Sequence, residues 1–328
     1  RVGPPLLVMG DVLSSCALGA VRAAFLFTFV VFTVPGWLYV CLMDVPVCAP
    51  QTPARLRQHG RFVATMMWRS WRAAMQTCFW LKLDWRGAAP LADAGKRGRP
   101  VCLLMNHQSF LDTALGCVLL PERLVPDIKV LMARRFLRAP VLGRIAQAIG
   151  HIPIPYATSN TWAMDKEEMA KIHRRIDEHV AQDGHLIVFP EGNLNERWET
   201  LMQFRGGCFE VCIRNDMEVW GVVTVGAGEC WPRDVRLGGG PTRFYTDAFL
   251  ISESAKTMAV DLVGDQVEIQ EQGRALANHT REIMQRHLDG LLAKRRAGSS
   301  VELAGGSEGS DAAFIQSTQN GHSGLRAR

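Results

Sequence analysis

No CxxC pair and no cysteine–histidine spacing typical of a metal site occurs in this sequence, although it contains nine cysteines among 328 residues. Disulfide-stabilised secreted domains usually carry an even number of cysteines, so this odd and scattered set predicts free thiols in a reducing compartment. Cys208 and Cys212 are four residues apart on an expected helix, which is more typical of two small buried side chains than of half a zinc site. We therefore expect no metal, no cofactor and a catalytic face exposed to the cytosol.

The sequence also lacks a concentrated basic stripe and any recognisable nucleic-acid-binding module. Its 37 lysines and arginines stand against 32 aspartates and glutamates, and they are spread along the chain. The densest basic run, residues 294–296, comes at the end of an expected helix, where cations interact favourably with the helix dipole. Nucleic acid is therefore not an expected partner. The net charge of +5 suits an anionic membrane surface or a phosphorylated substrate.

Charge is absent from residues 23–43, and Arg22 is the only charged residue between positions 17 and 43. A helix rises about 1.5 Å per residue, so this stretch is long enough to cross a hydrocarbon core about 30 Å thick. It is longer than the apolar region of a signal peptide and lacks a small-residue cleavage pattern. A kink at Pro35 and Gly36 leaves a two-piece hydrophobic hairpin as an alternative, and a buried core helix is another. We expect membrane insertion.

Residues 61–85 alternate cations with large apolar side chains and include four tryptophans, Trp68, Trp71, Trp80 and Trp85. Tryptophan, arginine and lysine side chains are typical of the lipid headgroup boundary. An amphipathic helix packed on a globular domain would show the same pattern, and the two interpretations are compatible. We therefore expect residues 1–87 to form membrane-inserted and interfacial helices, with a lipid membrane as a partner.

Short apolar segments alternate with helical patterns from residue 100 onward. Strands are expected at residues 101–105, 128–133, 151–155, 185–189 and 219–225. Helices are expected at residues 109–120, 136–148, 206–214 and 273–296, and another runs through Trp162 and Val180 to Gly184. This alternation predicts an α/β domain with a mixed, mostly parallel sheet flanked by helices, following an N-terminal membrane-associated helical segment.

The end of the chain has its own pattern. Residues 233–249 predict a hairpin around three consecutive glycines, residues 238–240. After residue 296, glycine, serine, asparagine and glutamine predominate and little can be buried, so we expect residues 297–328 to be disordered. The expected α/β domain therefore covers residues 88–296.

One candidate for chemistry follows the first expected strand, where residues 106–112 read NHQSFLD. In α/β folds, reactive groups commonly lie at the carboxyl ends of strands. His107 in the loop and Asp112 in the first helical turn could meet, so that the carboxylate holds the Nδ1 proton while Nε2 accepts a proton from a hydroxyl. The alternative is structural, because Ser109 and Asp112 also fit a helix-capping box.

A second candidate lies at the end of another expected strand, where residues 188–192 read VFPEG and place Glu191 at the strand tip. Residues 204–207 read FRGG and open an expected helix. A glycine-rich helix start offers free N–H groups to an anion, with Arg205 alongside. Taken singly, Glu191 could be a surface turn residue and the glycines an ordinary turn.

Together and in this order, these segments resemble the glycerolipid acyltransferase family, whose best-known members are lysophosphatidic acid acyltransferases. Residues 106–112 match the family's NHxxxxD block in full, residues 189–192 match the FPEG core of its third block, and residues 204–206 resemble its FKxG-like segment. Residues 133–135 and 148–153 look like its basic pair and its GHIP-type second block. The resemblance covers about residues 100–225.

The resemblance implies a membrane-bound enzyme that moves a fatty acyl group from acyl-CoA or acyl carrier protein to a lysoglycerolipid hydroxyl. The acceptor it favours is 1-acyl-glycerol-3-phosphate, giving phosphatidic acid at the endoplasmic reticulum or a bacterial inner membrane. It implies no metal and no covalent intermediate, and the sequence has no nucleophile elbow. The residues implied as catalytic are His107 and Asp112, and those implied as substrate-binding are Glu191, Gly192, Arg134, Arg135, Arg205 and Gly206.

The sequence departs from the family at two arginines associated with the acceptor's phosphate. Residues 154–156 read IPY where the second block normally ends in arginine, and residues 193–194 read NL where the third block has TR. A neutral residue cannot replace such charge-assisted contacts. Either other arginines supply the charge (Arg134, Arg135, Arg197 or Arg205), or the acceptor is another lysophospholipid. An inactive lipid-binding scaffold and a thioesterase are alternatives from other classes.

Overall fold

The computed structural model describes residues 6–45, 52–154, 166–235 and 237–304. Its centre is a seven-stranded sheet with the order β1-β7-β6-β2-β5-β3-β4. The strands are β1 (Leu81–Leu83), β2 (Val101–Met105), β3 (Ile128–Ala133), β4 (Ile152–Ile154), β5 (His185–Val188), β6 (Glu218–Val225) and β7 (Thr242–Ser252). The five strands from β6 to β4 are parallel to one another, whereas β7 is antiparallel to β6 and pairs in parallel with β1. The predicted mixed, mostly parallel sheet is confirmed.

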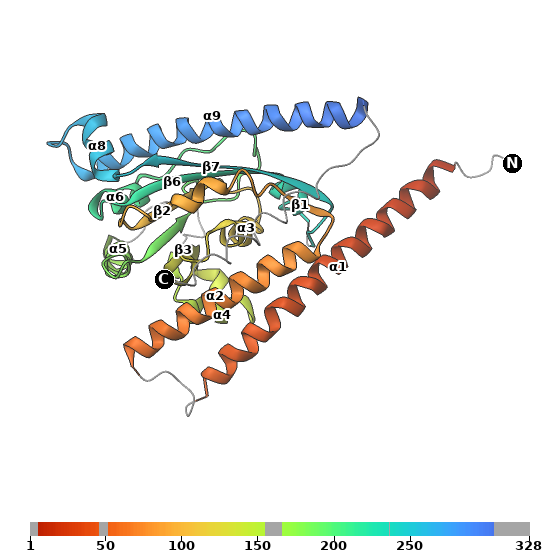
Figure 1. Ribbon diagram of the computed structural model, residues 1–328, viewed down its shortest axis with the longest axis horizontal. Coiled ribbons are helices and arrows are strands. Elements are labelled where there is room, and N and C mark those ends of the chain that lie inside the picture. Colours follow the sequence, from red (N-terminus) through yellow and green to blue (C-terminus); the bar gives the residue numbers. More distant parts are fainter. Residues whose placement is uncertain (1–5, 46–51, 155–165, 236, 305–328) are drawn as a thin grey trace, which may run out of the picture. The chain divides into compact units, whose positions relative to one another are not determined.

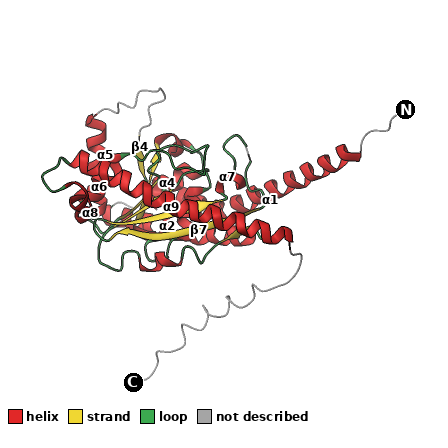
Figure 2. Ribbon diagram, turned by 90° about the horizontal axis from the view of Figure 1, so that it is seen from above, coloured by secondary structure: helices red, strands yellow, loops and turns green. Residues whose placement is uncertain are grey.

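Helices cover the sheet (Figure 1; Figure 2). The helices after β2 are α3 (Asp112–Leu119), α4 (Leu142–Ile149), α5 (Lys166–Val180), α6 (Gly206–Arg214), α7 (Ala227–Cys230), α8 (Ala255–Val263) and α9 (Ile269–Ala304). The short 3-10 turn η1 (Ala89–Asp93) precedes β2, and the turns η2 (Val125–Asp127) and η3 (Arg134–Arg138) flank β3. All five residues of β2 and all eight of β6 are buried. Burial on both faces explains why these strands read as continuous apolar runs rather than as alternating patterns.

The helix α1 (Leu6–Met43) is continuous through Pro35, so the two-piece hairpin alternative is wrong. Residues Ser15–Met43 are long and apolar enough to cross a membrane, and only 11% of the most apolar window is buried. The large apolar side chains that α1 exposes are Leu18, Leu26, Phe27, Val30, Val31, Leu38 and Leu42. A helix with such an apolar surface is typical of one that contacts lipid.

The helix α2 (Pro53–Thr77) begins with Thr52 as N-cap, whose hydroxyl accepts from the Arg55 N–H at 3.3 Å. It packs against both α1 and α4. Gly36 of α1 allows this approach, because a Cβ there would crowd the sulfur of Met67. The Trp71 indole N–H donates to the Thr33 hydroxyl at 3.1 Å, a second contact between the two helices. The packed-helix interpretation of this region is therefore correct, and its contact with lipid stays a prediction.

Two expectations of secondary structure are wrong. The helix expected at residues 136–148 is divided into η3 and α4, because Pro140 lacks a backbone N–H and keeps Ala139 extended. The hairpin expected at residues 233–249 does not form, because β7 pairs with the distant strands β6 and β1 instead.

Three further helices can be compared with the bounds expected from the sequence. The helix expected after residue 108 begins at Asp112. The last helix, α9, extends to Ala304, beyond the expected start of the disordered tail, and residues 305–328 lie outside the described part of the chain. The expected helical position of Trp162 also lies outside it, and α5 begins at Lys166.

Candidate active site

His107 and Asp112 meet at the carboxyl end of β2. The Nδ1 atom of His107 lies 3.0 Å from Oδ2 of Asp112, which is the first residue of α3. The Asp112 side chain is fully buried, whereas 21% of the His107 side chain is exposed. Since the carboxylate holds Nδ1, the matching tautomer leaves Nε2 as the nitrogen that can accept a proton.

The same carboxylate oxygen also organises the loop before α3. Oδ2 of Asp112 accepts from the backbone N–H groups of Gln108 at 2.6 Å and Ser109 at 2.7 Å. The carboxylate thus reaches back to the Ser109 N–H, as in a capping box, but the Ser109 hydroxyl donates to the Trp231 carbonyl at 2.9 Å instead. The structural and catalytic interpretations of Asp112 are therefore compatible in one geometry.

Beyond the end of β2, side-chain amides make hydrogen bonds to the backbone of β6. The Asn106 side chain accepts from the Thr224 N–H and donates to the Thr224 carbonyl, both at 2.9 Å. The Gln108 amide donates to the same carbonyl at 2.8 Å. These bonds fix the residues on both sides of His107 to β6. The His107 ring also stacks on Phe189, with centroids 4.3 Å apart and planes 27° apart.

Glu191 lies just after β5 and is 1% exposed. Its Oε1 atom accepts from the His107 N–H at 2.9 Å, and its Oε2 atom accepts from the Asn195 side-chain amide at 2.7 Å. The Asn195 N–H in turn donates to the His107 carbonyl at 2.7 Å. These three residues form a closed set of hydrogen bonds, which we call the backbone ring, and it holds both polar groups of the His107 main chain.

The backbone ring leaves Glu191 little capacity for a substrate. Oε2 also accepts from the Met202 N–H at 2.9 Å, so three protein donors occupy the two oxygens. Burial raises the pKa of the Glu191 carboxyl, while the Met202 and His107 N–H groups and the Asn195 amide lower it. This environment favours a positioning role over the substrate contact that the resemblance implies. Sequence reasoning missed Asn195, whose only signal is its place four residues after Glu191.

The predicted anion-binding residues Gly192, Arg205 and Gly206 lie together beside Glu191. Gly192 has φ +71°, a conformation that favours glycine, and a Cβ there would overlap the Arg205 side chain. The Arg205 N–H donates to the Pro190 carbonyl at 3.0 Å, and Gly206 begins α6. The guanidinium and the positive end of the helix dipole therefore occupy one region next to the backbone ring.

The other two predicted substrate contacts, Arg134 and Arg135, follow β3 at the same edge of the sheet. The Arg134 guanidinium pairs with Glu168 of α5 at 2.5 Å, and its side chain is 54% exposed. The Arg135 guanidinium carbon lies 5.3 Å from the centre of the Phe136 ring. That ring in turn meets Phe110, three residues after His107, with centroids 6.3 Å apart. Arg135 is thus linked to the His107 loop through two aromatic rings.

His151 and His179 are two histidines near β3 whose pKa values are lowered, mainly by burial. Burial lowers the pKa of His151 to about 4, with Lys129 and His179 acting in the same direction. Burial also lowers the pKa of His179 to about 4, again with Lys129. Because both pKa values are lower than the ordinary 6.5, the unfolded chain binds more protons between about pH 4 and 6.5. Acidification through this window therefore favours unfolding.

We expect the free energy of unfolding to fall by about 2 kcal/mol through His151 alone between about pH 7.5 and pH 5. Nδ1 of His151 accepts from the Val130 N–H at 3.2 Å, and an asparagine oxygen can replace that acceptor without titrating. His151→Asn should therefore show a shallower loss of stability in urea unfolding in detergent at the two pH values. An unchanged pH dependence in this variant would show that His151 does not cause the loss.

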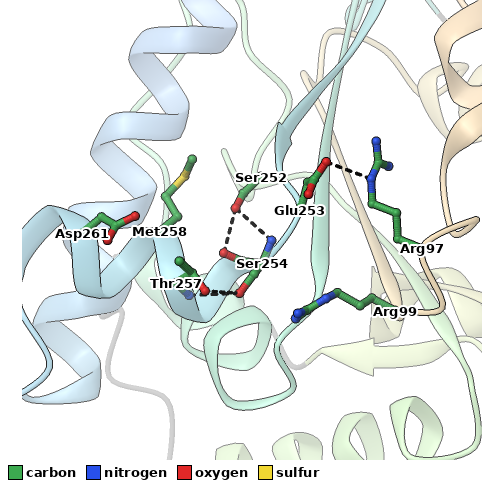
Figure 3. A pocket seen from close by; sticks show the side chains of 8 residues that line it. All are labelled: Arg97, Arg99, Ser252, Glu253, Ser254, Thr257, Met258 and Asp261. Carbon is green, nitrogen blue, oxygen red and sulfur yellow. Dashed lines mark hydrogen bonds and ion pairs between the residues drawn. The ribbon is translucent and has the colours of Figure 1, made fainter.

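A cavity of about 610 Å³ lies at the opposite end of β2 (Figure 3). Arg97 and Arg99 line it, and both are paired, Arg97 with Glu218 at 2.7 Å and Arg99 with Asp216. Both arginines precede β2, whereas His107 follows it, so this cavity does not adjoin the His107–Asp112 pair. The described residues also contain no group of three or more His, Cys, Asp or Glu side chains placed to hold a metal ion.

Comparisons with known proteins bear on the family and the fold of this chain. The family model "Acyltransferase" matches residues 90–225. The 1-acyl-sn-glycerol-3-phosphate acyltransferase alpha of Mus musculus is 25% identical over 210 residues, which are 63% of this chain and 66% of that protein, just under two thirds of its length. The crystal structure of the 1-acyl-sn-glycerophosphate (LPA) acyltransferase PlsC of Thermotoga maritima aligns with a TM-score of 0.57.

That alignment covers 85% of this chain and 98% of the PlsC chain, and at 13% identity it shows a shared fold. The family match includes the NHxxxxD and FPEG blocks and ends at the last residue of β6. The seven-stranded sheet that carries the blocks belongs to a fold that matches that of PlsC. Residues 90–225 therefore match an acyltransferase domain, and the chain resembles glycerolipid acyltransferases in sequence and in fold.

Proposed function

We propose that this enzyme is membrane-bound and transfers a fatty acyl group from acyl-CoA or acyl carrier protein to the hydroxyl of a lysoglycerolipid, with His107 as general base. The observation that carries the proposal is the 3.0 Å contact between His107 Nδ1 and the buried Asp112 carboxylate. A histidine held in this way presents Nε2 to a hydroxyl, and general-base catalysis requires that arrangement.

The reaction balances without a covalent enzyme intermediate. The acceptor hydroxyl gives its proton to Nε2 of His107 while its oxygen attacks the carbonyl carbon of the thioester. Asp112 stabilises the imidazolium that forms. When the tetrahedral intermediate collapses, the carbon–sulfur bond breaks and the imidazolium returns the proton to the leaving thiolate. The products are an ester and a free thiol, and the backbone ring keeps the imidazole in place throughout.

The proposed acceptor is 1-acyl-glycerol-3-phosphate. Two groups of cations at the carboxyl edge of the sheet support an anionic acceptor: Arg205 beside the start of α6, and Arg134 with Arg135 in η3. Together with Arg197, these are the candidates for the charge that the two missing family arginines would have supplied. Another lysophospholipid is the alternative acceptor, and an inactive lipid-binding scaffold is the alternative outside enzyme function.

The proposed location is a membrane, with the active site facing the cytosol. The apolar surface of α1 over Ser15–Met43 supports insertion, and the scattered cysteines support a reducing compartment. Residues 1–87 would then anchor the catalytic domain of residues 88–296, and residues 297–328 would form a tail. The endoplasmic reticulum and a bacterial inner membrane both fit this arrangement.

A panel of lysolipids tests the proposed function. Purified protein in detergent is supplied with an acyl-CoA and one lysolipid at a time, and free thiol is measured. We expect thiol release only when a lysolipid is present, with the highest kcat/KM for 1-acyl-glycerol-3-phosphate. Release without any lysolipid would instead indicate a thioesterase, and no release with any lysolipid would indicate a scaffold. A higher kcat/KM for an uncharged or larger acceptor would overturn the proposed phosphate contact.

A further inference from the structure

A continuous series of ring contacts leads from α1 to the loop that carries His107. The ring centroids of Phe29 and Phe25 of α1 lie 4.6 Å apart. The ring centroids of Phe25 and Trp231 lie 6.1 Å apart, and the two ring planes are perpendicular. Trp231 and Phe136 each lie 6.3 Å from Phe110. We call these five residues the aromatic ridge. Its first members belong to the candidate membrane span, and Phe110 belongs to the NHxxxxD block.

The three-glycine segment, for which the hairpin prediction failed, holds the middle of the ridge. A Cβ at Gly239 would overlap the Phe25 ring, and a Cβ at Gly238 would overlap Trp231. Gly239 also has φ +93°, a conformation that side chains other than glycine rarely adopt. The glycines thus let α1 and Trp231 approach the backbone closely. Consequently Phe25 is 3% exposed, although α1 is mostly exposed elsewhere.

Hydrogen bonds also connect the ridge to the loop between His107 and Asp112. The Ser109 hydroxyl donates to the Trp231 carbonyl at 2.9 Å, and the Trp231 indole N–H donates to the Val235 carbonyl at 3.1 Å. Ser109 is one of the two residues whose N–H groups bind the Asp112 carboxylate. The position of Trp231 is therefore fixed relative to the catalytic pair.

The far end of the ridge is exposed. Phe110 is 42% exposed and Phe136 is 41% exposed, whereas Ser109, Leu111 and Asp112 are buried. Leaving large apolar rings in water costs free energy in proportion to their area, so a pair of exposed rings beside a reactive group points to an apolar ligand. Arg135 lies beyond Phe136, with its guanidinium carbon 5.3 Å from the ring centre. The ridge therefore has an apolar end at α1 and a cationic end at η3.

This polarity matches a lysophospholipid that enters from a bilayer. We infer that the aromatic ridge binds the acyl chain of the acceptor, with the chain running from Phe110 over Trp231 toward α1 and the head group lying near His107 and Arg135. The inference rests on the proposed function, because it assumes a lysolipid acceptor. Beyond that function, the inference gives the path by which the acyl chain leaves the bilayer. It also gives a reason for the exposure of the Phe110 and Phe136 rings.

Photolabelling tests the path independently of catalysis. A lysolipid with a diazirine at the end of its acyl chain is incorporated into vesicles with the full-length protein, irradiated, and the labelled peptides are identified by mass spectrometry. We expect label on Phe29 or Trp231, the partly exposed members of the ridge next to α1. Label confined to other parts of the chain, or no specific label, would overturn the inference. If thiol release is absent but the ridge is labelled, the proposed function fails while the binding path stands.

Kinetics provide a second test in the active enzyme. With Phe29→Ala, at the α1 end of the ridge, we expect KM for an oleoyl acceptor to rise about tenfold, since the far part of a long chain loses an aromatic contact. KM for a hexanoyl acceptor should rise much less, because that chain is too short to follow the ridge. The matched control is Phe79→Ala, since Phe79 is 82% exposed and its ring contact is with Trp80 rather than with a ridge residue. Equal rises in KM for both chain lengths, or the same pattern in the control, would contradict the inference.

Discussion

Replacing His107 with alanine is expected to lower kcat for acyl transfer by about 10³- to 10⁴-fold, the upper part of the range for loss of a general base. The contact between Nδ1 and Asp112 orients the ring, and Nε2 is then the proton acceptor for the attacking hydroxyl. The contacts proposed to bind the phosphate and the acyl chain come from other residues, so KM for the lysolipid should change little. Initial rates of thiol release over a range of lysolipid concentrations measure both quantities.

A second variant tests the role of Asp112, and a third serves as a control. Asp112→Asn should lower kcat to a similar extent, because an amide that donates to Nδ1 favours the wrong tautomer. His279→Ala is the matched control, since His279 lies on α9 away from the NHxxxxD block, and it should retain wild-type rates. If the His107→Ala enzyme kept more than a small fraction of its activity, His107 would not be the base. Binding to vesicles should be unchanged in all three variants, because none of these side chains belongs to α1 or α2.

Glu191→Gln is expected to lower both stability and kcat. Oε1 and Oε2 accept three hydrogen bonds in a buried site, and a glutamine must place its NH₂ group against one or two of these donors. We expect the free energy of unfolding to fall by about 2 to 3 kcal/mol, the cost of leaving buried polar groups unsatisfied. We expect kcat to fall about 10²-fold, because the His107 backbone loses one of its supports.

Whether Glu191→Gln changes kcat or KM decides between a positioning role and a substrate-binding role for Glu191. A positioning residue changes kcat, whereas a substrate-binding residue, as the family resemblance implies, changes mainly the KM for the lysolipid. Asn195→Ala should reproduce the loss in kcat, since it breaks the bond between Asn195 and Glu191 within the backbone ring. A rise in KM at constant kcat in the Glu191→Gln enzyme would refute the positioning role.

Glu196→Gln is the matched control for Glu191→Gln. Glu196 lies in the same loop, and its replacement is the same change from carboxylate to amide. Its side chain, however, is 73% exposed and pairs with Arg233 at the surface. Exposed ion pairs contribute little, so we expect a change within about 0.5 kcal/mol and wild-type kinetics. A control as damaging as Glu191→Gln would mean that the loop as a whole, rather than the backbone ring, is sensitive.

Local patterns were sufficient wherever a segment is buried on both faces or begins with a strong signal. The apolar run of β2 and the glycine start of α6 were predicted with their observed bounds, because continuous burial and helix-start chemistry leave few alternatives. Residues 233–249 show where this reasoning failed. Glycines between two extended segments usually indicate a hairpin, but here they give space to the Phe25 and Trp231 rings, which no local pattern reveals.

The sequence by itself determined the alternating α/β domain and the apolar N-terminal helix, since these depend on periodicity. It made His107 and Asp112 a candidate pair through the order of several segments that together resemble a known family, and not through their spacing alone. Only the tertiary structure decided the surroundings of that pair. Glu191 reaches His107 across 84 positions because β5 lies next to β2, and Thr224 reaches Asn106 across 118 because β6 lies on the other side. Strand order depends on the packing of the whole sheet, so the hydrogen bonds of Glu191 to the His107 backbone became visible only once β2 was seen between its two neighbours.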